Sequence, residues 1–255
     1  MKKMWVIIKN AWKERMRRKE LYIVVAIGIL ILLFCSSGSA TISIEGEPIT
    51  SFDNMFMVIH TMMNAVGCLL AVILSLRTIP NEYERRNSHL IWVRGISQQK
   101  YHAGLALANV LSAVVAMAIL YLALAGYVVA NGRMDYLVRM LPAFLIVSLN
   151  VALASLLVSV LTIPLPAMAA GAIGFIFTAI GILHSILELY KNIAGGVAGT
   201  VLGGFLKILP DMHGIQVQAQ NLMAQEAVDV HMLLVGMLTL YVISLGLFVF
   251  KRKEA

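Results

Sequence analysis

Residues 55–76 read MFMVIHTMMNAVGCLLAVILSL, a stretch that contains no Asp, Glu, Lys or Arg. A helix needs about 20 apolar residues to cross the hydrocarbon core of a bilayer, which is about 30 Å thick. Similar runs lie at about 21–40, 104–130, 140–161, 166–187 and 231–250. We therefore expect an all-α integral membrane protein with six transmembrane helices, forming a single transmembrane domain over residues 1–255.

The composition places the chain in the same class. Of its 255 residues, 60% are hydrophobic and only 13% are charged, and the mean hydropathy is +0.86. Soluble domains carry about 25% charged residues. Both cysteines, Cys35 and Cys68, lie within predicted spans, so neither a disulfide framework nor a metal motif is indicated. His213 and His231 are distant from each other and from Cys, which gives no metal site.

The positions of Lys and Arg predict the orientation. Of 20 such residues, eight lie in 1–20, five in 77–102 and three in 251–255. Short loops rich in Lys and Arg stay in the cytoplasm. We therefore expect a multi-pass protein of the cell (plasma) membrane with both termini cytoplasmic. The net charge of +7 is explained by this topology, and no basic groove for nucleic acid is expected.

The first 20 residues have the pattern of an amphipathic helix. Apolar side chains recur at helical spacing on one face, while lysines and an arginine fill the other. Such a helix lies in the cytoplasmic headgroup layer of the bilayer. It acts either as a topology anchor alone or also as a brace for a cytosolic subunit. The apolar positions are Met4, Trp5, Ile8, Ala11, Trp12 and Met16.

The only long charged segment between two spans is 77–102, which reads RTIPNEYERRNSHLIWVRGISQQKYH. Pro80 suits a first helical turn, Asn81 is a capping residue type, and Glu84 three residues later completes a pattern like a capping box. Gly95 then ends the helix, and Ser97 caps the next one. We expect a helix over 81–93 on the cytoplasmic membrane surface, either solvated or in contact with a partner.

The region 188–230, between spans five and six, is expected on the outer side. Its stretch 192–209 is apolar and rich in glycine, but crossing the membrane there would place the basic tail outside. We therefore interpret it as a re-entrant or interfacial helical element. Pro210 and Asp211 restart a helix, which continues as a polar helix over 216–229.

Polar side chains in the second span form one stripe. Met57, His60, Thr61 and Asn64, followed by Cys68, recur at helical spacing. Polar residues within spans usually face a bundle interior or a cavity. The stripe is a candidate wall of a translocation path, and the alternative is hydrogen bonding or packing between helices.

The fifth span carries small residues along one face, which permit close packing of helices. These are Gly171, Gly174, Thr178, Gly181 and Ser185. Gly195, Gly199 and Gly203 continue this spacing and are consistent with packing against a neighbour. At the outer end of the span, His184 and Glu188 are four residues apart. This pair is a candidate outer gate, and the alternative is an ordinary interfacial ion pair.

The order of elements and the segment EYERRNSHLIWVRGISQQKYHAG, residues 82–104, resemble the permease subunits of type-2 ATP-binding-cassette exporters. In that family a Glu opens a coupling helix, and a Gly-Ile-Ser stretch leads into the third span. The matching positions are Gly95, Ile96, Ser97, Tyr101 and Gly104. Two positions depart from the pattern, because Gln98 stands where Arg is frequent and Leu105 where Lys is common.

The resemblance implies a half-transporter that works with a second permease chain, identical or similar, and with two ATPase subunits. It assigns contact with the ATPase to Glu82, Tyr83, Glu84, Arg86, Leu90, Ile91, Trp92, Arg94 and Gly95. No G-x-x-x-x-G-K-[ST] phosphate loop is present, so we expect no enzyme activity, metal or cofactor in this chain, with ATP and Mg on the partner.

The expected cargo is hydrophobic or amphipathic, such as a peptide toxin, a bacteriocin or a drug. The alternative is an ion-coupled secondary carrier or another membrane protein that does not depend on ATP. A membrane-embedded enzyme is disfavoured because the spans carry no acid except Glu188, at the edge of one of them.

Overall fold

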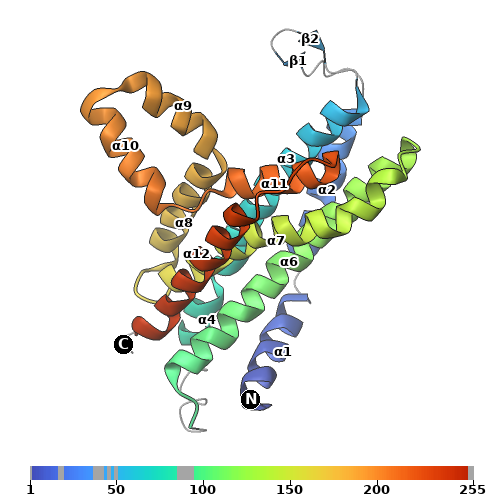
Figure 1. The fold of residues 1–255 in the computed structure, drawn as a ribbon. Coiled ribbons are helices and arrows are strands. Elements are labelled where there is room, and N and C mark those ends of the chain that lie inside the picture. Colours follow the sequence, from blue (N-terminus) through green and yellow to red (C-terminus); the bar gives the residue numbers. More distant parts are fainter. Residues whose placement is uncertain are drawn as a thin grey trace.

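The computed structural model describes residues 2–16, 20–36, 43–44, 47–48, 51–84 and 95–251. Almost all of them are helical (Figure 1). The described residues also include two short strands, β1 (Ser43–Ile44) and β2 (Glu47–Pro48), which pair antiparallel. The helices are α1 (Lys2–Met16), α2 (Glu20–Ser36), α3 (Phe52–Leu76), α4 (Thr78–Glu84), α6 (Gln98–Ala130), α7 (Asp135–Leu161), α8 (Ala167–Ile182), α9 (His184–Ala194), α10 (Gly196–Ile208), α11 (Met212–Ala224) and α12 (Val230–Val249).

The chain has the helices of a membrane-spanning protein. Within the described residues, four stretches are long and apolar enough to cross a bilayer: α3 with α4, α6, α7 and α12. A fifth is present if α8 and α9, which are bent by 75° relative to each other, count as one span. These match five of the six predicted spans. The sixth, at 21–40, coincides with the shorter apolar helix α2 and extends beyond the described residues, so it stays a prediction.

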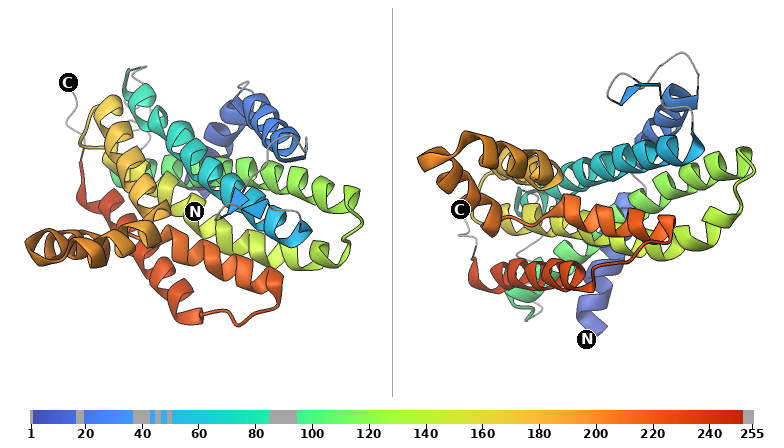
Figure 2. Two further views of the ribbon diagram at one scale, coloured as in Figure 1. Left: turned by 90° about the horizontal axis from the view of Figure 1, so that it is seen from above. Right: turned by 45° about the horizontal axis from the view of Figure 1, so that its top comes forward.

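The centre of the bundle is formed by α3, α6 and α7, which pack on one another. Helix α11 lies along α7, α12 covers α7 on another side, α8 packs on α3, and α1 and α2 lie against α6 (Figures 1 and 2). The interior is filled by large apolar side chains. Those with almost no exposed surface include Phe56, Ile59, Met63, Met117, Leu120, Leu124 and Leu153.

Small residues allow α8 to approach the bundle closely. A Cβ atom added to Gly171 would lie 2.7 Å from Leu76 Cδ1, and one added to Gly174 would collide with Val158. These glycines therefore permit contact with α3 and α7 of the same chain. The predicted packing role of the small residues in the fifth span is confirmed at these positions.

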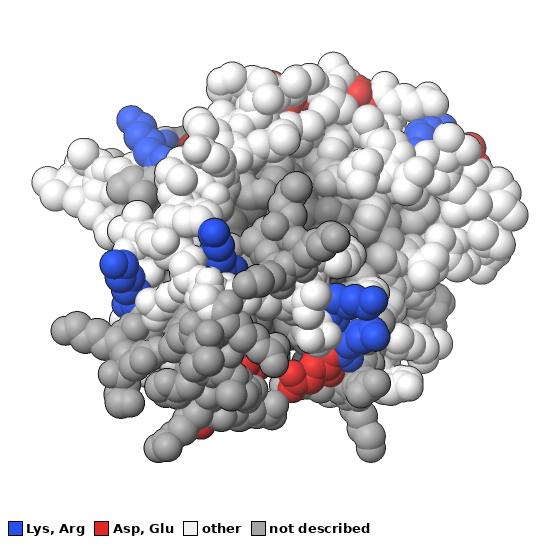
Figure 3. Space-filling model, turned by 90° about the horizontal axis from the view of Figure 1, so that it is seen from below, with Lys and Arg blue, Asp and Glu red and all other residues white. Residues whose placement is uncertain are grey.

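The two ends of the bundle are formed by different elements. Both termini and α4 lie at one end, called the terminal end, while β1, β2 and the turn from α6 to α7 lie at the other, called the distal end (Figure 1). Viewed from the terminal end, the described Lys and Arg side chains are spread over the surface and do not gather into one patch (Figure 3). This distribution agrees with basic residues placed beside separate spans.

The expected start of the coupling helix at Asn81 is wrong. Helix α4 begins at Thr78, only Arg77 separates it from α3, and the Asn81 N–H donates to the Arg77 carbonyl at 3.0 Å. The helix tolerates Pro80 at its third position, because the first N–H groups of a helix have no partner within it. The rest of the predicted helix, including Arg86, Leu90, Ile91, Trp92 and Arg94, lies outside the described residues.

The predicted break before the third span is present. Gly95 has a φ of +70°, a left-handed conformation that glycine adopts without steric cost. Ser97 occupies the N-cap position of α6, as predicted, although its side chain makes no capping hydrogen bond. Helix α6 therefore starts at Gln98, ahead of the apolar run that begins at Gly104.

Candidate functional site

The polar stripe of α3 is bonded to α11. Asn64 Nδ2 donates to Gln216 Oε1 at 2.7 Å, and Gln216 Nε2 donates to Thr61 Oγ1 at 2.7 Å. Asn64 is fully buried, and Gln216 is 1% exposed. Both groups of the Gln216 amide are therefore paired with α3 in the apolar part of the bundle.

Thr61 is the centre of this contact. Its hydroxyl donates to the Met57 carbonyl at 2.9 Å and accepts from both Gln216 and Gln220, the latter at 3.0 Å. A hydroxyl has one donor and two acceptor positions, so all three are used. Gln220 Nε2 also lies 3.3 Å from the Met57 carbonyl. The group formed by Met57, Thr61, Asn64, Gln216 and Gln220 is called the α3–α11 network.

The helical period explains why α11 can make this contact. Gln216 and Gln220 are four residues apart and so lie on the same face. The first turn of α11 is fixed to α7, where Asn150 Nδ2 donates to the Met212 carbonyl at 2.7 Å. The helix thus runs along the distal half of α7. It is not confined to the surface, although an outer polar helix was predicted here. The polar face of α11 is directed into the bundle.

His60, the remaining member of the predicted stripe, is bonded to a different helix. Its Nε2 lies 2.6 Å from the hydroxyl of Tyr121 on α6, and the two rings meet edge to face. His60 is fully buried, and Phe56 on the preceding turn stacks near it. His60 and Asn64 are thus fully buried, Met57 and Thr61 are half-buried, and the hydrogen bonds of the stripe connect α3 to α6 and α11. Hydrogen bonds between helices are therefore present at the stripe, and its role as the wall of a translocation path stays a prediction.

At the terminal end, α4 is attached to the first turns of α6. The Tyr101 hydroxyl donates to Glu82 Oε2 at 2.5 Å, and the Tyr83 hydroxyl lies 2.7 Å from His102 Nε2. Gln98 Nε2 donates to the Tyr83 hydroxyl at 2.8 Å. Glu82 and Tyr83, which were predicted to contact an ATPase, are thus half-buried against α6, a set of contacts called the α4 clasp.

A second series of hydrogen bonds joins α4 to the core. Thr78 Oγ1 donates to Asn109 Oδ1 at 2.7 Å, and Asn109 Nδ2 donates to Ser159 Oγ at 2.8 Å. One turn deeper, the hydroxyls of Ser75 and Ser155 lie 2.7 Å apart. These residues belong to α3, α4, α6 and α7. Short polar contacts therefore connect α4 to α6 and α7.

Glu84 differs from the other acid of α4. It is exposed, whereas Glu82 on the same helix is half-buried. Of the two carboxylates predicted to contact a partner, Glu84 is the one available on the surface.

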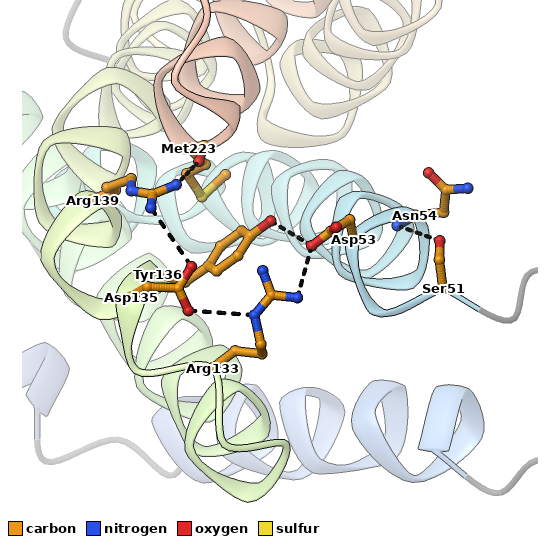
Figure 4. A network of polar contacts seen from close by, with 8 residues as sticks. All are labelled: Ser51, Asp53, Asn54, Arg133, Asp135, Tyr136, Arg139 and Met223. Atoms are coloured by element: carbon orange, nitrogen blue, oxygen red, sulfur yellow. Dashed lines mark hydrogen bonds and ion pairs between the residues drawn. The ribbon is translucent and has the colours of Figure 1, made fainter.

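The distal end is held by charged and aromatic side chains (Figure 4). Arg133 in the turn after α6 pairs with Asp53 at 3.2 Å and with Asp135 at 3.3 Å, and the Tyr136 hydroxyl donates to Asp53 at 2.6 Å. Arg139 pairs with Asp135 at 3.6 Å and donates to the Met223 carbonyl at 2.7 Å. These contacts join the first turn of α3, the first turns of α7 and the last turn of α11.

The Arg133 guanidinium is also surrounded by aromatic rings. It lies 4.9 Å from the ring centroid of Phe52 and 5.0 Å from that of Tyr136, a geometry that favours a cation. The hydrogen bond to Asp135 raises the pKa of Arg133 above its usual value. Sequence reasoning missed this cluster.

The predicted pair of His184 and Glu188 is not formed. His184 faces Asp211, with 3.7 Å between Nδ1 and Oδ2, whereas Glu188 is exposed and pairs with Lys191 at 3.6 Å. The reason is that His184 lies at the base of α9, where the chain packs against α11. One helical turn further, α9 has left the bundle, so Glu188 finds its partner within α9 itself.

The glycines of α10 pack within the chain. A Cβ on Gly199 would lie 2.8 Å from the Lys191 carbonyl, and one on Gly203 would lie 3.1 Å from Lys191 Cδ. The close approach therefore joins α10 to α9. The expected contact of these two glycines with a neighbour is made by a helix of the same chain, while Gly195 has nothing within 4 Å of such a Cβ.

No group of three or more His, Cys, Asp or Glu that could hold a metal ion occurs among the described residues. A scan of known family models gave no match to the chain, and a comparison with curated proteins gave none either. The site geometry and the apolar helices define the class of protein, a helical membrane-spanning protein whose spans are connected by buried polar contacts.

Proposed function

We propose that the chain is the permease subunit of a type-2 ATP-binding-cassette exporter in a cell membrane, with both termini cytoplasmic. The observation that carries the proposal is the α4 clasp. It lies in the polar segment between two spans, at the bundle end that also holds both termini, and it joins that segment to the start of α6. The resemblance of residues 82–104 to coupling segments gives this clasp its function.

In this proposal two copies of an ATPase subunit bind the segment that follows α4, and ATP and Mg are bound by those subunits. Closure of the ATPases displaces α4. The displacement reaches α6 through Tyr101 and His102, and α7 through Asn109 and Ser159. Rigid-body movement of packed helices then changes access to the cargo.

A second permease chain, identical or similar, completes the transporter. The cargo is a hydrophobic or amphipathic molecule, such as a peptide toxin, a bacteriocin or a drug, which is moved out of the cytoplasm. Broad apolar surfaces on α8 and α12 suit contact with lipid or with the second chain, since Met168, Phe175, Met237 and Tyr241 are each more than half exposed.

Co-purification with an ATPase subunit tests the proposal. The permease and the ATPase are expressed together, and the complex is isolated in detergent and assayed for ATP hydrolysis with amphipathic peptides. Glu84→Arg and the double change Leu90→Asp with Ile91→Asp are expected to release the ATPase. Glu226→Arg is the matched control, because Glu226 is also an exposed acid but follows α11. Retention of the ATPase by the first two variants would refute the coupling assignment.

The clasp itself is tested by Tyr101→Phe, which removes the donor to Glu82 and keeps the ring. We expect the ATPase to stay bound. Stimulation of ATP hydrolysis by cargo should fall about fivefold, which is the lower end of the change that allosteric coupling typically produces. Unchanged stimulation would show that the clasp does not transmit movement from α4 to α6.

The alternative function, an ion-coupled secondary carrier, is favoured by one observation. The chain between α8 and α11 consists of broken helices, and His184 faces Asp211 where they meet. Broken helices with ionisable groups inside the membrane are typical of such carriers. Transport in vesicles that depends on an imposed ion gradient, and continues without ATP or an ATPase, would support this alternative over the exporter.

A further inference from the structure

Helices α9 and α10 form a hairpin that projects from the bundle and joins it at its base (Figures 1 and 2). The chain bends by 75° between α8 and α9, and Pro210 lies between α10 and α11. Side chains along the hairpin are exposed, including Leu189, Ile193, Val197 and Phe205. The direction of the hairpin therefore depends on the contacts at its base.

The side chain of His184 lies at this base between two oxygen atoms. Its Nε2 is 3.4 Å from the Leu206 carbonyl oxygen of α10, and its Nδ1 is 3.7 Å from Asp211 Oδ2 before α11. A carbonyl and an ionised carboxylate only accept hydrogen bonds. A neutral imidazole has one N–H and attracts one of these oxygens, whereas an imidazolium has two N–H groups and attracts both.

The carboxylate is held in position by its own helix. Asp211 is the N-cap of α11, and its Oδ1 accepts from the Gly214 N–H at 2.7 Å. A negative charge is favourable at a helix N-terminus, which supports the ionised form as the partner of His184. The following residue, Met212, is bonded to Asn150 near the middle of α7. The pair therefore lies well inside the span of the bundle, where ionisable residues usually have a function.

Other titratable groups on the elements packed around His184 are few. Helix α9 carries Tyr190 and the pair of Glu188 and Lys191, which are 3.6 Å apart, and α10 carries Lys207 near its end. Helix α11 carries His213, and α8 carries no titratable side chain. Asp211 is the acid within ion-pair distance of His184 among the described residues.

We propose that His184 and Asp211 form a proton-binding site that fixes the base of the α9–α10 hairpin. The protonated imidazole holds α10 through Leu206 and α11 through Asp211 at the same time. The neutral imidazole holds only one of them, and when the contact with Asp211 is lost the hairpin is released from α11. The hairpin is therefore fixed while the imidazole carries both protons and is released when it loses one of them.

A distance measurement across the hairpin tests the site without any ATPase, so its outcome is separate from that of the proposed export function. Nitroxide labels are attached at Val197→Cys and Val138→Cys, both highly exposed, in full-length chain carrying Cys35→Ala and reconstituted in nanodiscs. Cys68 is fully buried and so stays unlabelled. Pulsed electron–electron double resonance then gives the distribution of the distance between the two nitroxide labels at a series of pH values.

The expected change follows from the length of the hairpin. Helix α9 has 11 residues, which makes an arm of about 16 Å at about 1.5 Å per residue. A rotation of about 20° at its base displaces the far end by about 6 Å. We expect a narrow distribution at acid pH, and a distribution displaced or broadened by about this amount at alkaline pH.

Two variants assign the change to the pair. His184→Gln is expected to give the alkaline distribution at every pH. Asp211→Asn removes the carboxylate partner and is expected to change the pH of the transition, and it preserves α11 because Asn is as good an N-cap as Asp. His231→Gln is the control, since His231 is exposed at the start of α12 and should behave as the native chain.

Three results would overturn the site. They are a native distribution that does not change between acid and alkaline pH, a change that persists in His184→Gln, and a transition in Asp211→Asn at the native pH. If His184→Gln fails to fold, Asp211→Asn alone decides, because its cap is retained.

Discussion

Replacing Gln216 by Leu should destabilise the bundle, because this side chain makes two hydrogen bonds to α3. The change removes the acceptor for Asn64 and one of the two donors to Thr61, each at 2.7 Å. Leucine has nearly the same volume as glutamine, so little cavity forms. The loss therefore reports mainly on the polar contact.

The magnitude follows from hydrogen bonds measured between helices in membranes. Such bonds contribute about 0.6 kcal/mol on average and at most about 1.7 kcal/mol, so two of them give about 1–3 kcal/mol. Asn64→Leu removes the same bond from the other side. In the double variant the two losses should overlap by about 0.5–1.5 kcal/mol, because both remove one shared contact.

Reversible unfolding in mixed micelles measures these differences for the native chain, the two single variants and the double variant. Thr239→Val is the control, since Thr239 is half-buried on α12 and, among the described residues, its hydroxyl bonds only the Val235 carbonyl in the turn before it. Its unfolding free energy should be close to native. Strictly additive losses for Gln216→Leu and Asn64→Leu would refute the α3–α11 network as a source of stability.

Two further predictions concern the base of the hairpin and the distal end. Gly181→Ala should cost about 1–3 kcal/mol in micelle unfolding, because its Cβ would lie 2.9 Å from the Pro210 carbonyl, whereas Gly126→Ala meets nothing within 4 Å and should not destabilise. Equal effects of the two changes would contradict this packing. Arg133→Gln breaks the ion pairs to Asp53 and Asp135 on the surface, so the unfolding midpoint should fall by less than about 3 °C at low salt and be unchanged at high salt. A loss that is independent of salt would show that the packing on the aromatic rings, and not the charge, is responsible.

The spans were predictable because their signal is local. An apolar run such as 104–130 is decided by its own composition and length, and no knowledge of neighbours is needed. The same holds for the break at Gly95 and for the small residues of α8, since both follow from properties of single residues.

The start of α4 was not predictable in the same way. Pro80 and Asn81 have the properties of a helix start, but those rules do not reveal whether the preceding helix has already ended. Helix α3 continues almost to Thr78, so a capping residue type at Asn81 falls inside a helix. Local capping preferences are weak, and the continuation of a long apolar helix overrides them.

The partners of polar side chains depend on tertiary packing. His184 and Glu188 have the spacing of a helical pair, but the 75° bend before α9 places Asp211 beside His184 instead. The sequence predicts the glutamines of α11 only as part of a polar helix on the outer side. A signal was nevertheless present, because Gln216 and Gln220 repeat at the same four-residue spacing as the polar positions of α3.

The α3–α11 network also has a consequence for biosynthesis. Asn64 and Gln216 are separated by 152 positions, and a ribosome adds about 5–20 residues per second. Helix α3 therefore waits about 8–30 s after leaving the ribosome before its partner exists. During that time the Asn64 amide, which is fully buried in the mature protein, lies beside the translocon or in lipid without its native acceptor. We expect the nascent chain to be most susceptible to quality-control proteases in this interval, and truncation before α11 to yield a rapidly degraded protein.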